Sequence, residues 1–304
     1  MHLALNFQRV DPTKGGAETY VADLCGRLIA AGHRVDLYAE SWREGVLPGE
    51  VRCVAVPVSG RARGARVASF GRNSEAALGR TQYDCTIGFI NTWAHDVIIP
   101  QGGVIQASLD ANSRRHPAGW RRSAYRLGKL AQPKHWTCRA IERVQYDPAR
   151  GARVVAVSAL VKEHLQQYHS VPRSRITVIP NAIDADRLKT AHPGAVRCAF
   201  RSKHGIAPGE LVGLFVGHNF ALKGLGPLLR AFAERRRRDP AGRPIRLLVC
   251  GGGSLGPFRR LAARLGLEDT VHLIGYEPDI RGGYWASDFF VSPTYYDPCS
   301  LVVF

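Results

Sequence analysis

Short apolar runs alternate along the chain with longer stretches in which apolar residues recur at helical spacing. The clearest pair is the run 3–7 followed by 17–31, where Val21, Leu24 and Leu28 share one helical face. Such alternation is typical of βαβ units around a parallel sheet. We expect strands at 3–7, 34–39, 51–56, 85–89, 97–100, 153–157, 176–179, 211–216, 246–250, 271–274 and 289–292.

Helices between these strands carry end signals. Gly32 follows the stretch 17–31 and suits a left-handed C-cap, while Ser158 precedes 159–168 and can cap its first turn. Two further helices are expected at about 225–238 and 257–265.

The strand–helix pattern restarts after Asn181-Ala182-Ile183-Asp184. A chain of 304 residues can bury two separate cores. We therefore predict an α/β protein with two Rossmann-like domains, residues 1–183 and 184–304.

Bulk composition narrows the class of protein. Hydrophobic residues make up 45% of the chain, and no run approaches the roughly 18 to 20 apolar residues that cross a bilayer. The seven cysteines are widely spaced without a C-x-x-C pair, which favours reduced thiols in the cytoplasm. A net charge of +17 indicates an anionic partner, or else simply a solvated basic surface.

The segment 114–150 breaks the alternation. It carries ten Arg or Lys residues against two acids, with Trp120, Tyr125, Trp136 and Tyr146 interleaved. Such segments often lie at a headgroup boundary, although these aromatics can equally pack onto the first domain. The residues predicted to contact a membrane surface or acceptor are Arg114, Arg115, Trp120, Arg121, Arg122, Arg126 and Lys129.

Three glycine loops follow predicted strands, where open α/β sheets bind ligands. Gly15-Gly16 opens the first helix, Lys223-Gly224 precedes 225–238, and Gly251-Gly252-Gly253 follows 246–250. Glycine lets backbone amides approach a phosphate, and lysine can pair with it. The alternatives are tight turns and a surface lysine. Residues 251–256 also fit G-x-G-x-x-G, but the acidic partner of an NAD site is not clearly placed.

Several ordered strings together resemble family 4 glycosyltransferases, which have the two-Rossmann GT-B fold. They are Gly15-Gly16-Ala17-Glu18, Val155-Ala156-Val157-Ser158, Val178-Ile179-Pro180-Asn181, Phe215-Val216-Gly217 with Lys223-Gly224, and Ala286-Ser287-Asp288 with Ser292-Pro293-Thr294. Two more strings, Gly71-Arg72-Asn73 and Gly88-Phe89 with Asp96-Val97, are similar to the lipopolysaccharide core glucosyltransferase I subgroup.

The resemblance implies two domains facing across a cleft and a retaining transfer of a hexose, glucose in this subgroup, from a nucleoside-diphosphate sugar such as UDP-glucose. The acceptor is a hydroxyl of a glycolipid or lipopolysaccharide core, and no metal or other cofactor is required. Catalytic residues are expected at Asp96, Lys223 and Asp297. The donor-binding residues are expected to be Gly15, Gly16, His218, Lys223, Gly224, Gly252, Asp297, Ser300 and Leu301.

Two features depart from the family pattern. Asp297 stands where the first glutamate of an acidic pair is usual, and the second acid would follow Phe304, so we expect an incomplete second domain and an inactive fragment. The loop before Lys223 lacks the usual arginine, which weakens diphosphate binding unless His218 or a distant arginine replaces it.

Other functions stay open on the sequence alone. They are another GT-B enzyme, such as a nucleotide-sugar epimerase or glycogen-type synthase, and a basic nucleic-acid-binding protein. For the glycosyltransferase we expect a cytoplasmic location, peripheral at the inner membrane, and no nucleic-acid partner. We interpret Asp184 and Asp186 as turn and helix-cap residues, not as metal ligands.

Overall fold

The computed structural model describes residues 1–93 and 95–304. The chain forms two compact units. The first unit is Met1–Asn181 with Asp297–Ser300, and the second unit is Ala182–Tyr296 with Leu301–Phe304. The chain therefore passes between units after Asn181, two residues before the predicted boundary, and the short segment 297–300 groups with the first unit.

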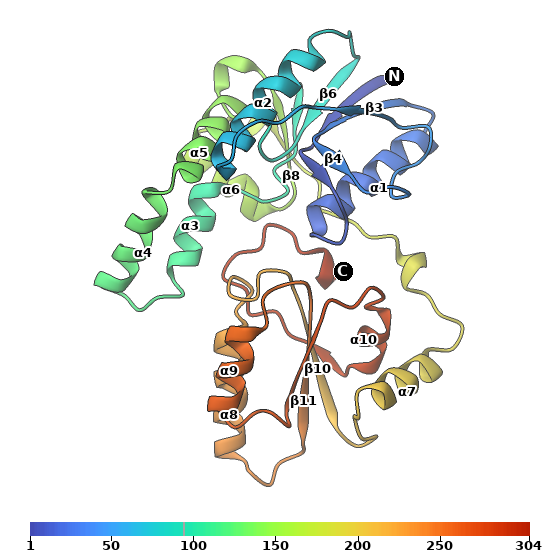
Figure 1. Ribbon diagram of the computed structural model, residues 1–304, viewed down its shortest axis with the longest axis vertical. Helices are drawn as coiled ribbons and strands as arrows, with labels where there is room; N and C mark the ends of the chain where they lie inside the picture. Colours follow the sequence, from blue (N-terminus) through green and yellow to red (C-terminus); the bar gives the residue numbers. More distant parts are fainter. Residues whose placement is uncertain (94) are drawn as a thin grey trace. The chain divides into compact units, whose positions relative to one another are not determined.

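The first unit is built on a seven-stranded parallel sheet in the order β5-β3-β1-β6-β7-β8-β9 (Figure 1). Its strands are β1 (His2–Asn6), β3 (Arg34–Ala39), β5 (Arg52–Ala55), β6 (Cys85–Gly88), β7 (Val97–Ile98), β8 (Arg153–Ala156) and β9 (Ile176–Val178). A separate pair joins β2 (Arg9–Val10) and β4 (Ser41–Trp42). The helices are α1 (Gly16–Ala30), α2 (Arg63–Leu78), α3 (Ile105–Ser113), α4 (Trp120–Leu130), α5 (Pro133–Gln145) and α6 (Ala159–His169).

Local signals explain the first elements. Leu3, Ala4 and Leu5 of β1 are all buried, as expected for a central strand covered on both faces. Helix α1 ends in a Schellman motif, because Gly32 has φ 79° and its amide and that of His33 donate back into the last turn. The predicted C-cap is confirmed, as is the Ser158 N-cap, whose hydroxyl accepts from the Val161 amide at 3.2 Å.

The second unit has a four-stranded parallel sheet in the order β12-β11-β10-β13. Helices α8 and α9 pack on one face around Phe215, Leu229 and Val249, while α7 and α10 pack on the other around Leu214 and Leu248 (Figure 1). The elements are η3 (Ala185–Leu188), α7 (Pro193–Lys203), β10 (Leu211–Val216), α8 (Leu225–Arg238), β11 (Ile245–Cys250), α9 (Gly256–Arg264), β12 (Val271–Gly275), α10 (Arg281–Ala286), β13 (Phe289–Phe290) and η4 (Leu301–Val303).

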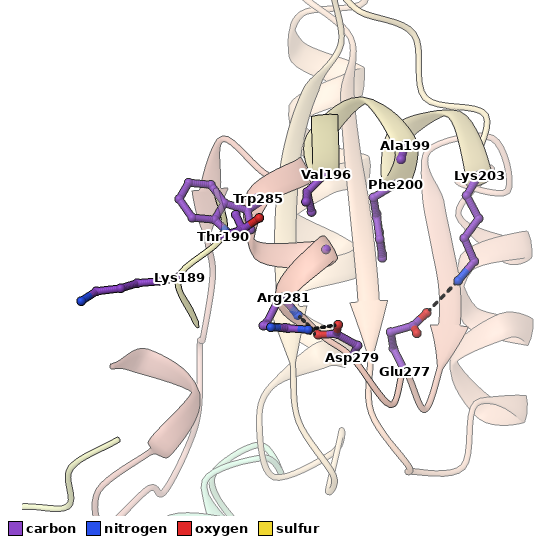
Figure 2. A pocket seen from close by; sticks show the side chains of 11 residues that line it. Lys189, Thr190, Val196, Ala199, Phe200, Lys203, Glu277, Asp279, Arg281 and Trp285 are labelled. Atoms are coloured by element: carbon purple, nitrogen blue, oxygen red, sulfur yellow. Dashed lines mark hydrogen bonds and ion pairs between the residues drawn. The ribbon is translucent and has the colours of Figure 1, made fainter. Parts of the chain in front are cut away.

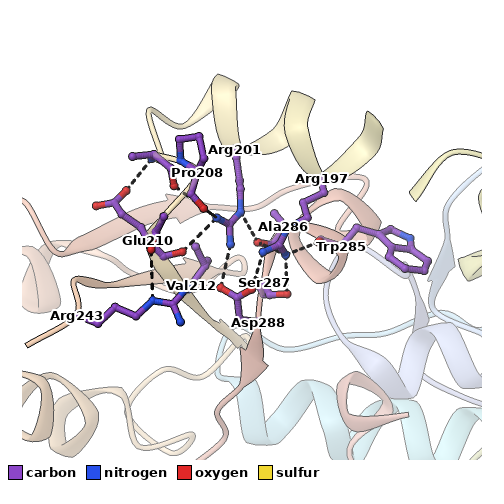
Figure 3. Close-up of polar contacts among 12 residues, drawn as sticks. Arg197, Arg201, Pro208, Glu210, Val212, Arg243, Trp285, Ala286, Ser287 and Asp288 are labelled. Atoms are coloured by element: carbon purple, nitrogen blue, oxygen red, sulfur yellow. Dashed lines mark hydrogen bonds and ion pairs between the residues drawn. The ribbon is translucent and has the colours of Figure 1, made fainter. Parts of the chain in front are cut away.

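A buried arginine anchors α7 to this sheet (Figure 3). The Arg201 guanidinium donates to the Ala286 carbonyl at 2.9 Å and to the Asp288 carboxylate at 2.9 Å. Asp288 also accepts from the Val212 amide and pairs with Arg197. Burial alone would raise the pKa of Asp288, but the amide and the two arginines outweigh it and lower that pKa.

Every predicted strand is present, with ends that differ by no more than two residues. The apolar pattern did not predict six of the helices, namely α2, α3, α4, α5, α7 and α10. Two of them, α4 and α5, lie in the segment 114–150. Glycines and arginines interrupt the apolar periodicity of these helices, so tertiary packing determines where they form.

Each sheet has one point where the strand order reverses. In the first unit it lies between β1 and β6, and in the second between β10 and β13. The loops at the carboxyl ends of these strands are the places where open α/β sheets bind ligands.

Candidate functional site

Two glycine loops interlock at the carboxyl edge of the second unit. They are 217–224, after β10, and 251–255, after β11. Gly251 has φ 136°, and a β-carbon there would overlap the Gly217 carbonyl oxygen. The Gly217 amide donates to the Cys250 carbonyl at 3.0 Å. Only glycine allows this approach, so the two loops form one continuous backbone surface.

Lys223 is held by the first of these loops. Its side-chain stem packs on Gly217, where a β-carbon would lie 3.0 Å from Lys223 Cγ. The Asn219 side chain accepts from the Leu222 amide at 3.2 Å, and the Asn219 carbonyl accepts from the Lys223 amide at 2.9 Å. These bonds form a tight turn that holds Lys223 just before α8. At this place the positive end of the helix dipole and the ammonium charge both attract an anion.

Gly224 ends this loop and packs against the segment that follows β13, on the other side of the switch point. It has φ 81°, and a β-carbon there would overlap the carbonyl oxygen of Pro293. The Tyr295 amide donates to the Leu222 carbonyl at 2.9 Å. The segment after β13 therefore borders the Lys223 loop, and the predicted residues His218, Lys223, Gly224 and Gly252 all lie on these adjoining loops.

Asp297, Ser300 and Leu301 lie on the segment after Tyr296. Asp297 and Ser300 belong to the first unit, where the carbonyl of their neighbour Cys299 accepts from Asn181 Nδ2 at 2.9 Å. The buried Asn181 side chain also accepts from Gln101 Nε2 at 3.0 Å. Leu301 begins η4 in the second unit. Their roles in donor binding stay predictions.

In the first unit, Gly15 and Gly16 follow β1 at the carboxyl edge. Gly15 is the N-cap of α1 and has no side chain to cover the first amides, and Gly16 is the first helical residue and is exposed. The Glu18 carboxylate lies over this turn, since a β-carbon at Gly15 would be 2.8 Å from Glu18 Oε2, so an anion that approaches these amides meets that carboxylate. Their contact with a donor diphosphate stays a prediction.

Asp96 lies elsewhere. Its carboxylate accepts from the amide and the hydroxyl of Thr86, both at 2.8 Å, near the start of β6. Because Asp96 immediately precedes β7, this is the amino side of the parallel strands, away from their ligand-binding edge. In the structure the Asp96 carboxylate holds the entry to β7, and its position beside the reacting sugar stays a prediction.

The titratable group at the carboxyl edge is the preceding residue, His95. Its ring lies against Gly88, the last residue of β6, and its Nε2 is 3.2 Å from Nδ2 of Asn6, the last residue of β1. Asn6 Nδ2 also donates to Ser74 Oγ at 2.9 Å. Burial lowers the pKa of His95 to about 4, although Asp96 opposes the shift, so the imidazole is neutral at physiological pH.

The sequence pattern did not predict this polar cluster of Asn6, Ser74 and His95. Ser74 and His95 lie 68 and 89 residues after Asn6, and no local pattern links them. The one usable signal was a polar residue, Asn6, at the end of an otherwise apolar strand.

The basic segment places part of its cations and aromatics on an outlying helix, α4. No residue of α4 is buried, and α4 lies away from the sheet, while α5 packs against α2 (Figure 1). Trp120 is 75% exposed and Leu127 is 66% exposed on one helical face, while Arg122, Arg126 and Lys129 share another.

Parts of this segment are tied to the first unit. Arg126 pairs with Asp110 at 2.6 Å, and Arg115 and Lys129 lie over the Tyr125 ring. The alternative that the aromatics pack inward is correct for the buried Tyr146 and wrong for Trp120 and Trp136. In the described part of the chain, no helix is both long and apolar enough to cross a membrane.

A cavity of about 400 Å³ lies elsewhere in the second unit, between α7 and α10 (Figure 2). Phe200 and Trp285 line it, and four of its five charged side chains pair within the wall, Lys203 with Glu277 at 3.2 Å and Arg281 with Asp279 at 2.6 Å. Paired charges leave little net attraction for an ionic ligand.

The residues outside position 94 contain no group of three or more His, Cys, Asp or Glu side chains arranged to hold a metal ion. The Asp184 carboxylate accepts from the Asp186 amide at 3.1 Å, which confirms Asp184 as a cap of η3. Asp186 pairs with Lys189 at 2.6 Å.

Comparison with known proteins decides the family. Residues 14–187 match the model of Glycosyltransferase Family 4, and residues 196–304 match that of Glycosyl transferases group 1. The chain belongs to glycosyltransferase family 4. Its two sheets, each with its own switch point, are the paired Rossmann-like domains of this family's GT-B fold.

Individual family 4 glycosyltransferases are similar over different spans. Lipopolysaccharide glucosyltransferase WaaG of Escherichia coli is 24% identical over 95% of this chain and 73% of its own length. D-inositol 3-phosphate glycosyltransferase of Nocardia farcinica is 37% identical over 51% of this chain, and the match spans only 35% of that relative.

Solved glycosyltransferase structures share the fold. A crystal structure of WaaG, involved in lipopolysaccharide biosynthesis, has a TM-score of 0.82 at 22% identity and covers 99% of this chain and 77% of that chain. Anabaena HepE in complex with UDP and glucose has a TM-score of 0.64 at 17% identity and covers 98% and 76% of the two chains.

Proposed function

We propose that this glycosyltransferase transfers a hexose, glucose, from a UDP-sugar to a hydroxyl of a glycolipid or lipopolysaccharide core, with retention at the anomeric carbon and without a required metal. The names of WaaG and of the UDP- and glucose-bound HepE structure support this choice of donor and acceptor. The single observation that carries the proposal is the pair of interlocked glycine loops that presents Lys223 and His218 at the carboxyl edge of β10 and β11.

The chemistry suits these residues. When the bond between C1 of the sugar and the diphosphate oxygen breaks, positive charge develops on the sugar and negative charge on the leaving diphosphate. The Lys223 ammonium and the positive end of the α8 dipole stabilise that negative charge. Preorganisation by the Asn219 turn means that little rearrangement is needed as the charge develops.

A donor screen tests this function. We expect UDP-glucose to raise the thermal unfolding temperature of the chain more than ADP- or GDP-sugars, and addition of EDTA to leave the shift unchanged. Lys223→Ala should weaken donor binding about tenfold or more, because a charge-assisted contact is lost. The matched control is Lys203→Ala in the same unit, whose partner is Glu277. Equal donor affinity in both variants would remove Lys223 from the site.

We also propose that α4 carries the enzyme to the cytoplasmic surface of the inner membrane, where a lipid-linked acceptor resides. The exposed Trp120 and Leu127 face supplies apolar area, and the exposed Arg121, which lies over the Trp120 ring, suits anionic headgroups. Helix α4 would lie in the interface plane, with its Trp120 and Leu127 face toward the lipid.

A further inference from the structure

Helices α8 and α9 form one layer on the same face of the second unit's sheet (Figure 1). The stretch 225–266, which contains both helices, carries ten arginines against two acids, Glu234 and Asp239. Eight of the arginines are exposed, namely Arg230, Arg236, Arg237, Arg238, Arg243, Arg259, Arg260 and Arg264. None of them belongs to the glycine loops 217–224 and 251–255, so the candidate donor site does not explain this basic face.

Few of these charges are compensated within the chain. Glu234 pairs with Arg237 at 2.8 Å and with Arg238 at 2.7 Å. Arg236 donates to the Gly266 carbonyl at 2.5 Å, a neutral acceptor that ties the end of α8 to the loop after α9. Among the residues that the structure describes, six of the exposed arginines form no ion pair: Arg230, Arg236, Arg243, Arg259, Arg260 and Arg264.

Helix stability accounts for only part of this basic character. The run 235–238 occupies the last turn of α8 and Arg264 the last turn of α9, where cations offset the negative end of the helix dipole. Arg230, Arg259 and Arg260 lie before those turns, and the dipole effect falls off within one turn. An anionic partner from outside the chain explains these three.

The arginine face lacks apolar anchors. Every residue of α8 and α9 is described, and no large hydrophobic side chain among them is exposed. Their two aromatic residues, Phe232 and Phe258, pack against the core. Protein–protein interfaces centre on aromatic anchors, and single-stranded nucleic acid stacks on aromatic rings. Guanidinium groups without either feature suit a surface that presents many phosphates at once, as an anionic bilayer does.

We propose that the outer face of α8 and α9 is a second membrane contact, held by attraction between arginines and lipid phosphates without insertion. This inference rests on the proposed attachment of the enzyme to the membrane through α4. The two contacts differ in kind, because α4 exposes Trp120 and Leu127 whereas the arginine face exposes cations alone. When both engage one bilayer, each raises the effective concentration of the other at the surface.

Vesicle sedimentation of the 304-residue chain tests this contact. The face variant combines Arg230→Gln, Arg259→Gln and Arg260→Gln. The matched control makes the same change at three exposed arginines of the first unit, Arg27, Arg80 and Arg173, so that both variants lower the net charge of +17 equally. With vesicles rich in phosphatidylglycerol at about 0.1 M salt, binding of the face variant should fall about tenfold or more, while the control stays near wild type.

The outcomes separate this contact from the rest of the proposal. Equal losses in the two triple variants would mean that net charge drives binding, and would overturn the inference. Unchanged binding of the face variant, with loss when Trp120 and Leu127 are replaced, would leave α4 as the contact and the inference wrong. If wild type does not bind anionic vesicles at all, the proposed membrane attachment itself is overturned.

Two further measurements complete the test. An RNA oligonucleotide that binds wild type and not the face variant, while vesicle binding is unchanged, would assign the face to nucleic acid and overturn the membrane contact. Thermal unfolding of both triple variants, expected to match wild type, confirms that a lost affinity is not a lost fold.

Discussion

The α-carbon of Gly224 lies directly against the carbonyl oxygen of Pro293, 69 residues further along the chain. This contact joins the lysine loop after β10 to the segment after β13, the two sides of the switch point. The position also has φ 81°, which other residues adopt only with strain. Steric fit and backbone conformation therefore both require glycine.

Gly224→Ala should lower the free energy of unfolding by about 2 kcal/mol or more, because strain at φ 81° adds to overlap with Pro293. Donor affinity should fall with it, since Lys223 precedes the displaced residue. Denaturant unfolding and UDP titration measure the two effects. The control is Gly226→Ala within α8, where the nearest atom is the flexible Arg230 side chain at 3.6 Å and alanine favours the helix. Similar losses in both variants would contradict this account.

Asp96→Ala should cost about 1 to 2 kcal/mol of unfolding free energy, because the Thr86 amide and hydroxyl lose their acceptor. UDP affinity should stay unchanged. A double-mutant cycle with Thr86→Val should show coupling between the two residues. Loss of transferase turnover with full stability would instead place Asp96 at the reaction centre.

Arg201→Met should destabilise the second unit by about 2 to 4 kcal/mol, because it leaves the Ala286 carbonyl and the Asp288 carboxylate with fewer donors. Arg230→Met, at an exposed position of α8, is the matched control and should change stability little. Urea unfolding distinguishes them. Equal stability of the two variants would mean that α7 is held by apolar packing alone.

Acid should weaken the first unit through Asp36. Burial alone would raise the pKa of this carboxyl, but hydrogen bonds from Arg52 at 2.5 Å and Tyr83 at 2.7 Å outweigh it and lower the pKa. A lowered folded pKa contributes stability above the ordinary carboxyl range, near pH 4, and loses it as pH falls through the folded value.

The unfolding free energy of Asp36→Asn should therefore approach that of wild type as pH falls from about 7 to about 3. Urea midpoints at several pH values measure the convergence. Parallel curves across the whole range would show that the carboxylate of Asp36 contributes no pH-dependent stability.

Membrane binding should depend on the apolar face of α4. Replacing Trp120 and Leu127 together by alanine should reduce sedimentation with anionic vesicles by about tenfold or more, because their exposed side chains supply the inserting area. Leu160→Ala, an exposed leucine of α6, should have no effect. Neutral vesicles should bind wild type weakly, and equal binding to both lipid types would contradict the electrostatic part of the proposal.

Local pattern alone determined much of the fold. The strands, the Gly32 and Ser158 caps, the restart of the pattern near Asn181 and the glycine loops are all visible in the sequence, because each depends on neighbours a few residues away. The same loops predicted Lys223, Gly224 and Gly252 as site residues, because the ligand-binding edge of a parallel sheet follows from the strand order.

Only the tertiary structure decided what each loop touches. It brought Pro293 against Gly224, drew segment 297–300 into the first unit, and put Asp96 on the amino side of the sheet while its neighbour His95 reached the carboxyl edge. Sequence cannot foresee these pairings, because they join residues far apart in the chain and because one step along an extended segment turns the side chain to the opposite face.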